Sequence, residues 1–306
     1  MILVLRALGV GDLATGVPAV RALRAAFPDV ELALAAPAWL TPLIALIGGV
    51  DRIVPCAGLD DPLPPLTGVT VAVNLHGKGP QSHKKLSAVR PGALWAHANE
   101  IFTDGPQWRE DQHEVQRWGR MLRFYGVPTD DLDLDLGVPA VDVPHGATIV
   151  HPGAKSQSRR WPPDRYARVA RELAAAGHRV IVTGSAAEHE LAVRIAAEAG
   201  LGADAAPSTG LDELAGLIAH ARLLISGDTG VAHLATAFGT PSVTLFGPQP
   251  PSRWGPPPDR PRHRVIWHGV RAEPGDSSGP GVHQALLAIT VPEVLAEAHS
   301  HGWSEK

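Results

Sequence analysis

A short apolar strand followed at once by an acidic turn and a helix is the feature that most constrains the fold of this chain. Residues 222–226 are typical of the strand, residues 227–230 supply Gly-Asp-Thr-Gly, and residues 231–238 are typical of the helix. In an open α/β sheet such a turn lies at the carboxyl edge of the sheet, where ligands bind. Thr229 and Gly230 would present backbone N–H groups at a helix N-terminus, which suits a phosphate. An ordinary helix cap at this turn is the structural alternative.

The N-terminus repeats this strand–turn–helix order. Residues 2–6 predict a strand, and a helix is expected over about 13–27. Gly9 and Gly11 permit a tight turn between them and the close approach of a ligand. Asp12 therefore falls near a helix N-terminus, again at the carboxyl end of a strand.

A third strand, at residues 147–150, precedes a basic turn at residues 151–163. The turn carries Lys155, Arg159 and Arg160, and arginine can hold a phosphate with two parallel hydrogen bonds. A solvated basic loop is the alternative. Strand and helix patterns alternate along the whole chain, which predicts an α/β fold made of βαβ units around parallel sheets.

The length of 306 residues allows two domains, each with its own core. Residues 126–146 carry three prolines and five aspartates with little helical period, which is typical of a linker. We therefore expect an N-terminal domain over 1–145 and a C-terminal domain over 146–306.

Net charge and cysteine content narrow the functional classes. The net charge of −4 gives no indication of nucleic-acid binding. No apolar run reaches the roughly 18 residues that a membrane span requires. The single cysteine, Cys56, excludes an internal disulfide and fits a reducing compartment. The N-terminal residues are typical of a strand and not of a secretory leader. We expect a cytoplasmic protein, with peripheral attachment to the inner face of the membrane left open.

Four segments, in this order along the chain, resemble glycosyltransferase family 9, the heptosyltransferase family of lipopolysaccharide core assembly. They are the Gly-Asp turn at 11–12, His-Pro-Gly-Ala…Arg-Trp-Pro at 151–162, Gly-Asp-Thr-Gly-Val-Ala-His at 227–233, and Leu-Phe-Gly-Pro…Arg-Trp-Gly-Pro at 245–256. The resemblance implies the GT-B architecture, two Rossmann-like domains facing across a cleft. The N-terminal domain would then serve the acceptor and the C-terminal domain the nucleotide sugar. A helix near 291–299 would return to the N-terminal domain.

The resemblance also implies the chemistry. Family members transfer a sugar from a nucleotide-diphosphate donor, typically ADP-heptose, with inversion and without a metal. The matching aspartate, Asp12 beside Gly11, would be the base that takes the proton of the acceptor hydroxyl. Lys155, Arg159 and Arg160 would face the diphosphate. The family's basic residue often stands two positions before the tryptophan, which favours Arg159 over Arg160.

The acidic turn of the C-terminal domain would hold the donor. Asp228 would contact hydroxyls of the donor sugar, and the amides of Thr229 and Gly230 would contact phosphate. His233, about one helical turn further on, could face the diphosphate or be an ordinary helix histidine.

A second carboxylate could bind the ribose. The strand that ends at Thr183 is followed by Glu188, and a carboxylate at this place in a Rossmann-like domain can bind both ribose hydroxyls. Glu190 is the other candidate, and a helix-start glutamate without a ligand is the alternative.

We expect neither a metal nor an organic cofactor. Asp131, Asp133 and Asp135 alternate as in an extended linker. An EF-hand would need Gly at its sixth position and Glu at its twelfth, where this chain has Leu136 and Asp142.

The acceptor, a glycan or a small molecule, is less constrained than the donor. Residues 74–85 follow a strand of the N-terminal domain, and His76, Lys78, Lys84 and Lys85 could meet an anionic acceptor or line a solvated loop. The tail of the chain lacks the cysteines that family members often carry there, a departure that concerns the acceptor more than the donor.

Three other functions fit parts of this pattern. A GT-B sugar-nucleotide epimerase is disfavoured by the short turn at Asp12 together with the ordered C-terminal motifs. A non-catalytic nucleotide-sugar binder is disfavoured because Asp12 and Asp228 are both present. A nicotinamide dehydrogenase is disfavoured because residues 9–14 lack the third glycine of its fingerprint.

Overall fold

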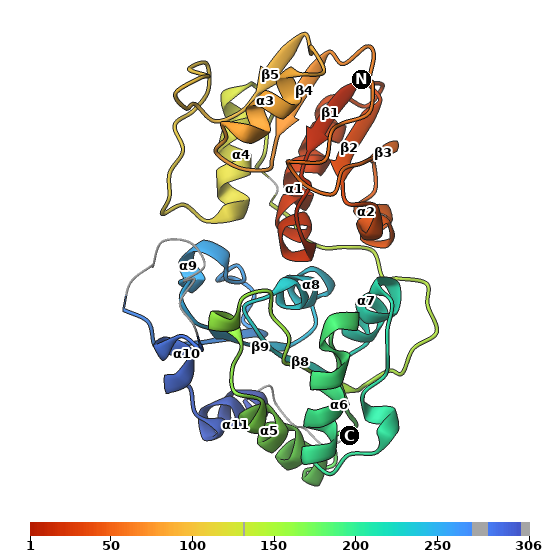
Figure 1. The fold of residues 1–306 in the computed structure, drawn as a ribbon, viewed down its shortest axis with the longest axis vertical. Helices are drawn as coiled ribbons and strands as arrows, with labels where there is room; N and C mark the ends of the chain where they lie inside the picture. The colour runs from red at the N-terminus through yellow and green to blue at the C-terminus, as the bar shows by residue number, and fades with distance from the viewer. Residues whose placement is uncertain (131, 271–280, 301–306) are drawn as a thin grey trace. The chain divides into compact units, whose positions relative to one another are not determined.

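The computed structural model describes residues 1–130, 132–270 and 281–300 (Figure 1). The chain divides into two compact units, Met1–Gly137 and Val138–Lys306. The predicted boundary, after residue 145, lies a few residues further along. The side chains of Val141 and Val143 lie against Gly216, so this part of the predicted linker packs on the second unit.

The first unit contains a parallel five-stranded sheet. Every residue of its two central strands β1 and β2 is buried, as in a sheet with helices on both faces. Its strands lie in the order β3 (Arg52–Pro55), β2 (Leu32–Ala36), β1 (Ile2–Leu5), β4 (Val71–Asn74) and β5 (Ala93–Trp95). Its helices are α1 (Val10–Ala26), η1 (Ala38–Leu40), α2 (Thr41–Ile47), α3 (Gln81–Ser87) and α4 (Glu114–Phe124). The strand order reverses between β1 and β4, which makes this the switch point of the first sheet.

The second unit contains a similar parallel sheet. Its strands lie in the order β10 (His263–Trp267), β9 (Ser242–Phe246), β8 (Leu223–Gly227), β6 (Thr148–His151) and β7 (Val180–Val182). Its helices are η2 (Gln157–Arg159), α5 (Pro163–Ala175), η3 (Ala186–Glu188), α6 (His189–Glu198), η4 (Ala203–Ala205), α7 (Leu211–Ala219), α8 (Gly230–Phe238), α9 (Pro251–Trp254), α10 (Gln284–Ala288) and α11 (Val291–His299). The strand order reverses between β6 and β8. The two sheets confirm the predicted α/β fold.

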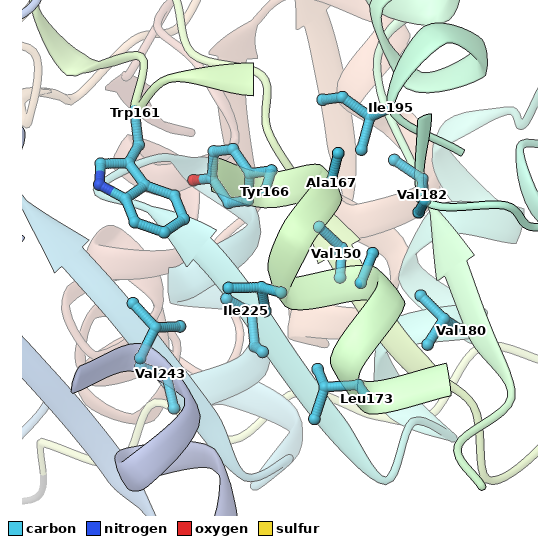
Figure 2. Close-up of a cluster of buried hydrophobic side chains, with 14 of the residues drawn as sticks. Val150, Trp161, Tyr166, Ala167, Leu173, Val180, Val182, Ile195, Ile225 and Val243 are labelled. Carbon is cyan, nitrogen blue, oxygen red and sulfur yellow. The ribbon is translucent and has the colours of Figure 1, made fainter. Parts of the chain in front are cut away.

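The core of the second unit gathers around α5 and the strands beneath it, as Figure 2 shows. Trp161 and Tyr166 pack edge to face, with ring centroids 5.0 Å apart. The indole Nε1 of Trp161 donates a hydrogen bond to the carbonyl of Ile289 at 3.1 Å. The tryptophan of the basic-turn motif therefore joins that turn to the segment between α10 and α11.

The last helix, α11, forms at the predicted residues. Val291, Val294 and Ala298 are buried in the core of the second unit, where α11 packs on α5 and β9. Its return to the N-terminal domain stays a prediction. Within the described ranges, no helix has both the length and the apolar character needed to span a bilayer.

Candidate functional site

The predicted turns lie at the switch points of the two sheets. In the first unit, β1 leads into the turn with Asp12, and the neighbouring β4 leads into the loop with His76. In the second unit, β6 leads into the basic turn, and the neighbouring β8 leads into the turn with Asp228. Ligands of open α/β sheets bind at such points. Each unit is therefore a candidate binding site in its own right.

Asp12 lies in the first turn of α1 because this helix begins at Val10, three residues earlier than predicted. Its Oδ2 accepts a hydrogen bond from the backbone N–H of the N-cap residue Gly9 at 3.3 Å, so the carboxylate caps the start of the helix. Gly11 lies within the same first turn. The carboxylate is only half-buried and acts electrostatically on His76. The predicted base therefore caps its helix and also lies at the carboxyl edge of the sheet.

A buried arginine that the sequence pattern does not reveal lies beside this turn. Arg6 follows β1 directly and is 1% exposed. Its guanidinium donates to the backbone carbonyls of Asp12 and Leu75. The only signal for it in the sequence is a charged residue placed directly after a fully apolar strand.

The acidic turn of the second unit pairs with the basic turn. Arg159 Nη1 lies 3.6 Å from Asp228 Oδ2. Asp228 is buried, and its backbone N–H donates to the carbonyl of Leu245 at 3.0 Å. Thr229 is the N-cap residue of α8 and Gly230 is its first residue. The structure thus places a guanidinium and a helix N-terminus beside one carboxylate.

Glu188 and Arg160 form a second pair in the same unit. Arg160 Nη2 lies 3.8 Å from Glu188 Oε1, and Arg160 Nε donates to the carbonyl of Ala154 at 2.8 Å. Glu188 Oε2 accepts from the backbone N–H of Ser185 at 3.1 Å and from its hydroxyl at 2.7 Å. Burial raises the pKa of Glu188, but the bonds from Ser185 and the charges of His151 and Arg160 outweigh it and lower the pKa overall. Glu188 is therefore held as an anion.

His151 connects this pair to the end of β7. Its Nδ1 lies 3.0 Å from the hydroxyl of Thr183, and its ring is buried. Burial lowers the pKa of His151, opposed by the Glu188 carboxylate, so the imidazole is neutral. In the sequence His151 stands only at the start of a turn, and nothing local indicates that it is buried.

Two other predicted residues belong to the same unit. Lys155 is exposed in the loop between β6 and η2. His233, in α8, packs edge-on against Trp254, with ring centroids 6.0 Å apart. In the described part of the chain, no three side chains of His, Cys, Asp or Glu are grouped to hold a metal. Asp131 lies outside the described residues.

Two Rossmann-like units with acidic and basic side chains at their switch points fit the class of GT-B enzymes. Residues 107–275 match glycosyltransferase family 9 (heptosyltransferase), and the chain belongs to this family. The predicted family, its GT-B architecture and the prediction of a glycosyltransferase are confirmed, which decides against the epimerase and the non-catalytic binder.

Some relatives match along nearly the whole chain. Lipopolysaccharide heptosyltransferase 2 of Salmonella typhimurium is 28% identical, with 98% of this chain and 97% of the relative covered. The solved structure of E. coli ADP-heptose LPS heptosyltransferase II has a TM-score of 0.76 at 24% identity, with 98% of each chain covered. E. coli heptosyltransferase WaaC with ADP has a TM-score of 0.71 at 17% identity, with 98% of this chain and 99% of that chain covered. These structural likenesses show the fold.

Proposed function

We propose that this glycosyltransferase transfers a heptose from ADP-heptose to a hydroxyl of a lipopolysaccharide core acceptor, with inversion of the anomeric centre and without a metal ion. The nature of the relatives supports the donor and the acceptor, since one is named a lipopolysaccharide heptosyltransferase and another an ADP-heptose enzyme. The single observation that carries the proposal is the Arg159–Asp228 pair beside the N-terminus of α8.

The donor site follows from this pair. A helix N-terminus and a guanidinium both attract a phosphate, and together they can stabilise the charge that develops on a departing diphosphate. We assign the diphosphate to Arg159 and to the amides of Thr229 and Gly230, with Lys155 and His233 as further donors. Asp228, beside Arg159, would accept hydrogen bonds from hydroxyls of the sugar. This arrangement supplies positive charge where other transferases use a metal.

The ribose site follows from the second pair. Glu188 is an anion held by Ser185 at the end of the β7 loop, and Arg160 lies beside it, while the hydroxyl of Thr183 bonds with His151. A carboxylate in this position of a Rossmann-like unit can accept hydrogen bonds from two adjacent hydroxyls. We therefore assign the ribose to Glu188. In this assignment Arg159 serves the sugar diphosphate and Arg160 holds Glu188.

The transfer itself would be one displacement. The acceptor oxygen forms a bond to the anomeric carbon as the bond from that carbon to the diphosphate oxygen breaks. ADP departs with the bonding electrons, and Asp12 takes the proton of the acceptor hydroxyl. Attack opposite to the leaving group inverts the anomeric centre.

The acceptor and the location belong to the same proposal. The loop after β4 and helix α3 carry His76, Lys78, Lys84 and Lys85. We propose that these side chains bind anionic groups of the acceptor. Lys78 already forms an exposed ion pair with Glu110 at 2.9 Å, which an acceptor would have to replace. Cys56 is a buried free thiol, which is compatible with the reducing cytoplasm that we propose as the site of action.

The experiment that tests this function compares Asp12→Asn with the unchanged enzyme. Asparagine keeps the shape of the side chain and removes its basicity. Turnover should fall at least about a hundredfold, because a general base contributes about a hundred- to ten-thousand-fold. ADP affinity, measured by calorimetry, should stay the same because the donor site belongs to the other unit. Asp29→Asn, on the exposed turn after α1, is the matched control with unchanged turnover.

The donor is identified by a thermal-shift screen over nucleotide sugars. A ligand present at about a hundred times its dissociation constant stabilises the protein by roughly 2.7 kcal/mol. ADP-heptose should give a larger shift than nucleotide sugars with other bases or hexoses. Full turnover in Asp12→Asn would refute the assignment of the base, and a larger shift with another donor would refute the assignment of the substrate.

A further inference from the structure

The side chain of Arg6 joins the two sides of the switch point in the first sheet. Its Nε donates to the backbone carbonyl of Asp12, and its Nη1 donates to the backbone carbonyl of Leu75. Its Nη2 donates to the hydroxyl of Thr15 at 2.9 Å. The first turn of α1 and the start of the loop after β4 are therefore bonded to one guanidinium.

Arg6 lies beside a buried carboxylate, Glu114, which also pairs with Arg117. Nη2 of Arg6 lies 3.3 Å from Oε1 of Glu114, and both side chains are buried. Glu114 Oε1 also accepts from the indole N–H of Trp118 at 2.8 Å, and the guanidinium lies over the ring of Trp118, 5.2 Å from its centroid. A buried ion pair adds little net stability, because the desolvation of both charges offsets their attraction. A role beyond stability would explain why a charged residue is placed here.

Helix α1 is adapted to this arginine. A Cβ atom on Gly16 would lie 2.8 Å from both Cδ and Nε of Arg6. A glycine inside a helix costs roughly 0.5–1 kcal/mol relative to alanine. The helix therefore carries a destabilising residue at a place where a side chain would displace the guanidinium of Arg6.

His76 is held on the other side of the switch point. Its backbone N–H donates to Asn74 Oδ1 at 3.0 Å, and Asn74 Nδ2 donates to the carbonyl of Gly77 at 3.0 Å. Within the described structure, the Nδ1 of His76 is buried without a hydrogen-bond partner. Burial lowers the pKa of His76 to about 4, helped by the charges of Arg6 and Lys85 and opposed by Asp12. A neutral imidazole therefore lies near the carboxylate of Asp12.

We propose that Arg6 is a positioning residue of the transfer reaction, which aligns the turn of Asp12 with the loop that carries His76. The proposal rests on the assignment of Asp12 as the base. A cationic His76 would favour the charged form of Asp12 and weaken it as a base. The buried positive charge of Arg6 opposes that protonation, while its hydrogen bonds hold the backbone on both sides.

Two variants separate the charge from the geometry. Arg6→Met removes both, and turnover should fall roughly ten- to a hundredfold, because small displacements of reacting groups have effects of this size. ADP affinity should not change. The pKa of His76, followed by NMR and assigned with His76→Gln, should rise from about 4. Arg6→Lys keeps the charge but cannot reach both carbonyls as the planar guanidinium does. Its turnover should fall about tenfold with the titration of His76 nearly unchanged.

Arg24→Met is the matched control. Arg24 lies at the other end of α1, where it donates to the carbonyls of Gly49 at 2.9 Å and Pro28 at 2.8 Å and pairs with Asp51. Its loss should lower thermal stability and leave turnover and the titration of His76 unchanged. A structural role for Arg6 would give the same result as this control.

The outcomes are distinct. If Arg6→Met keeps its turnover and the titration of His76, or loses only stability as Arg24→Met does, the proposal is overturned. If Arg6→Met does not fold, Arg6→Lys decides, and full turnover in that variant overturns the proposal. If Asp12→Asn loses turnover but the Arg6 variants stay fully active, the role of Arg6 is overturned and Asp12 remains the proposed base. Full turnover in Asp12→Asn would overturn the proposed base and this inference together.

Discussion

Replacing Gly153 with alanine should displace the carboxylate that we assign to the ribose. A Cβ atom on Gly153 would lie 2.5 Å from Cδ and 2.6 Å from Oε1 of Glu188, closer than side chains approach each other in proteins. Gly153 directly follows the buried start of the basic turn, so its backbone has little freedom to move. The flexible end of the Glu188 side chain should therefore swing away.

The size of the effect follows from what Glu188 would lose. Its Oε2 accepts two hydrogen bonds from Ser185, at 3.1 and 2.7 Å. A hydrogen bond to a charged group contributes about 1.5–3 kcal/mol, and Ser185 is exposed enough for water to replace part of that. We expect Gly153→Ala to lower the free energy of unfolding by about 1–2 kcal/mol. If the ribose makes comparable bonds to Glu188, ADP affinity should fall roughly ten- to a hundredfold, since 1.4 kcal/mol corresponds to a factor of ten.

Calorimetry with ADP and urea unfolding measure the two effects separately. Gly58→Ala is the control, because a Cβ on Gly58 would meet no atom within 4 Å. Glu188→Gln, which keeps the volume of the side chain and removes its charge, should weaken ADP binding in the same direction. If Gly153→Ala loses stability but binds ADP as the unchanged protein does, Glu188 only caps η3, and the ribose assignment is refuted.

Three further predictions concern the donor, the metal and acid stability. Asp228→Ala should weaken donor binding or turnover in a folded protein, because it removes the partner of Arg159, and unchanged calorimetric affinity and rate would contradict the donor site. Transfer should persist after exhaustive chelation, and activity that is lost and then restored by magnesium would show that a metal is needed. Burial and the charges of Arg120 and Arg117 lower the pKa of His97 to about 3. In the unfolded chain the imidazole of His97 binds a proton near pH 6.5, whereas in the native protein it stays neutral at that pH. The free energy of unfolding should therefore fall by up to about 1.4 kcal/mol per pH unit below pH 6.5. The melting temperature of His97→Gln should fall less between pH 7 and pH 5 than that of the unchanged protein, and an equal fall in both proteins would contradict this.

The local patterns predicted the strand–turn–helix units well. The turns with Asp12, Asp228 and the basic residues lie where the sequence places them, because periodicity and glycine spacing act over a few neighbouring residues. Helix α1 begins earlier than predicted, at Val10, since Gly9 is its N-cap and the side chain of Asp12 completes the cap. A shift of about one turn in the start of a helix depends on hydrogen bonds that a sequence pattern does not reveal.

Short elements with weak patterns were harder to predict. Residues 74–85 lack a helical pattern and are expected to form a loop, whereas α3 forms over Gln81–Ser87. Ser82 and His83 are buried there and bond with Asn74 at the end of β4, at 2.9 and 3.3 Å. Contacts between different elements stabilise this helix, and an isolated helix of its length would not be stable in water.

The amino-acid sequence by itself determined the family, the two parallel α/β sheets and the turns that carry the charged residues. Only the tertiary structure decided how the charges pair, because partners such as Arg6 and Glu114 stand 108 residues apart in the chain. It also separated two neighbours in the basic turn, Arg159 beside Asp228 and Arg160 beside Glu188. Consecutive side chains at the end of a short helix point in different directions, and only the packing of that turn against β7 and β8 loops selects the partner of each.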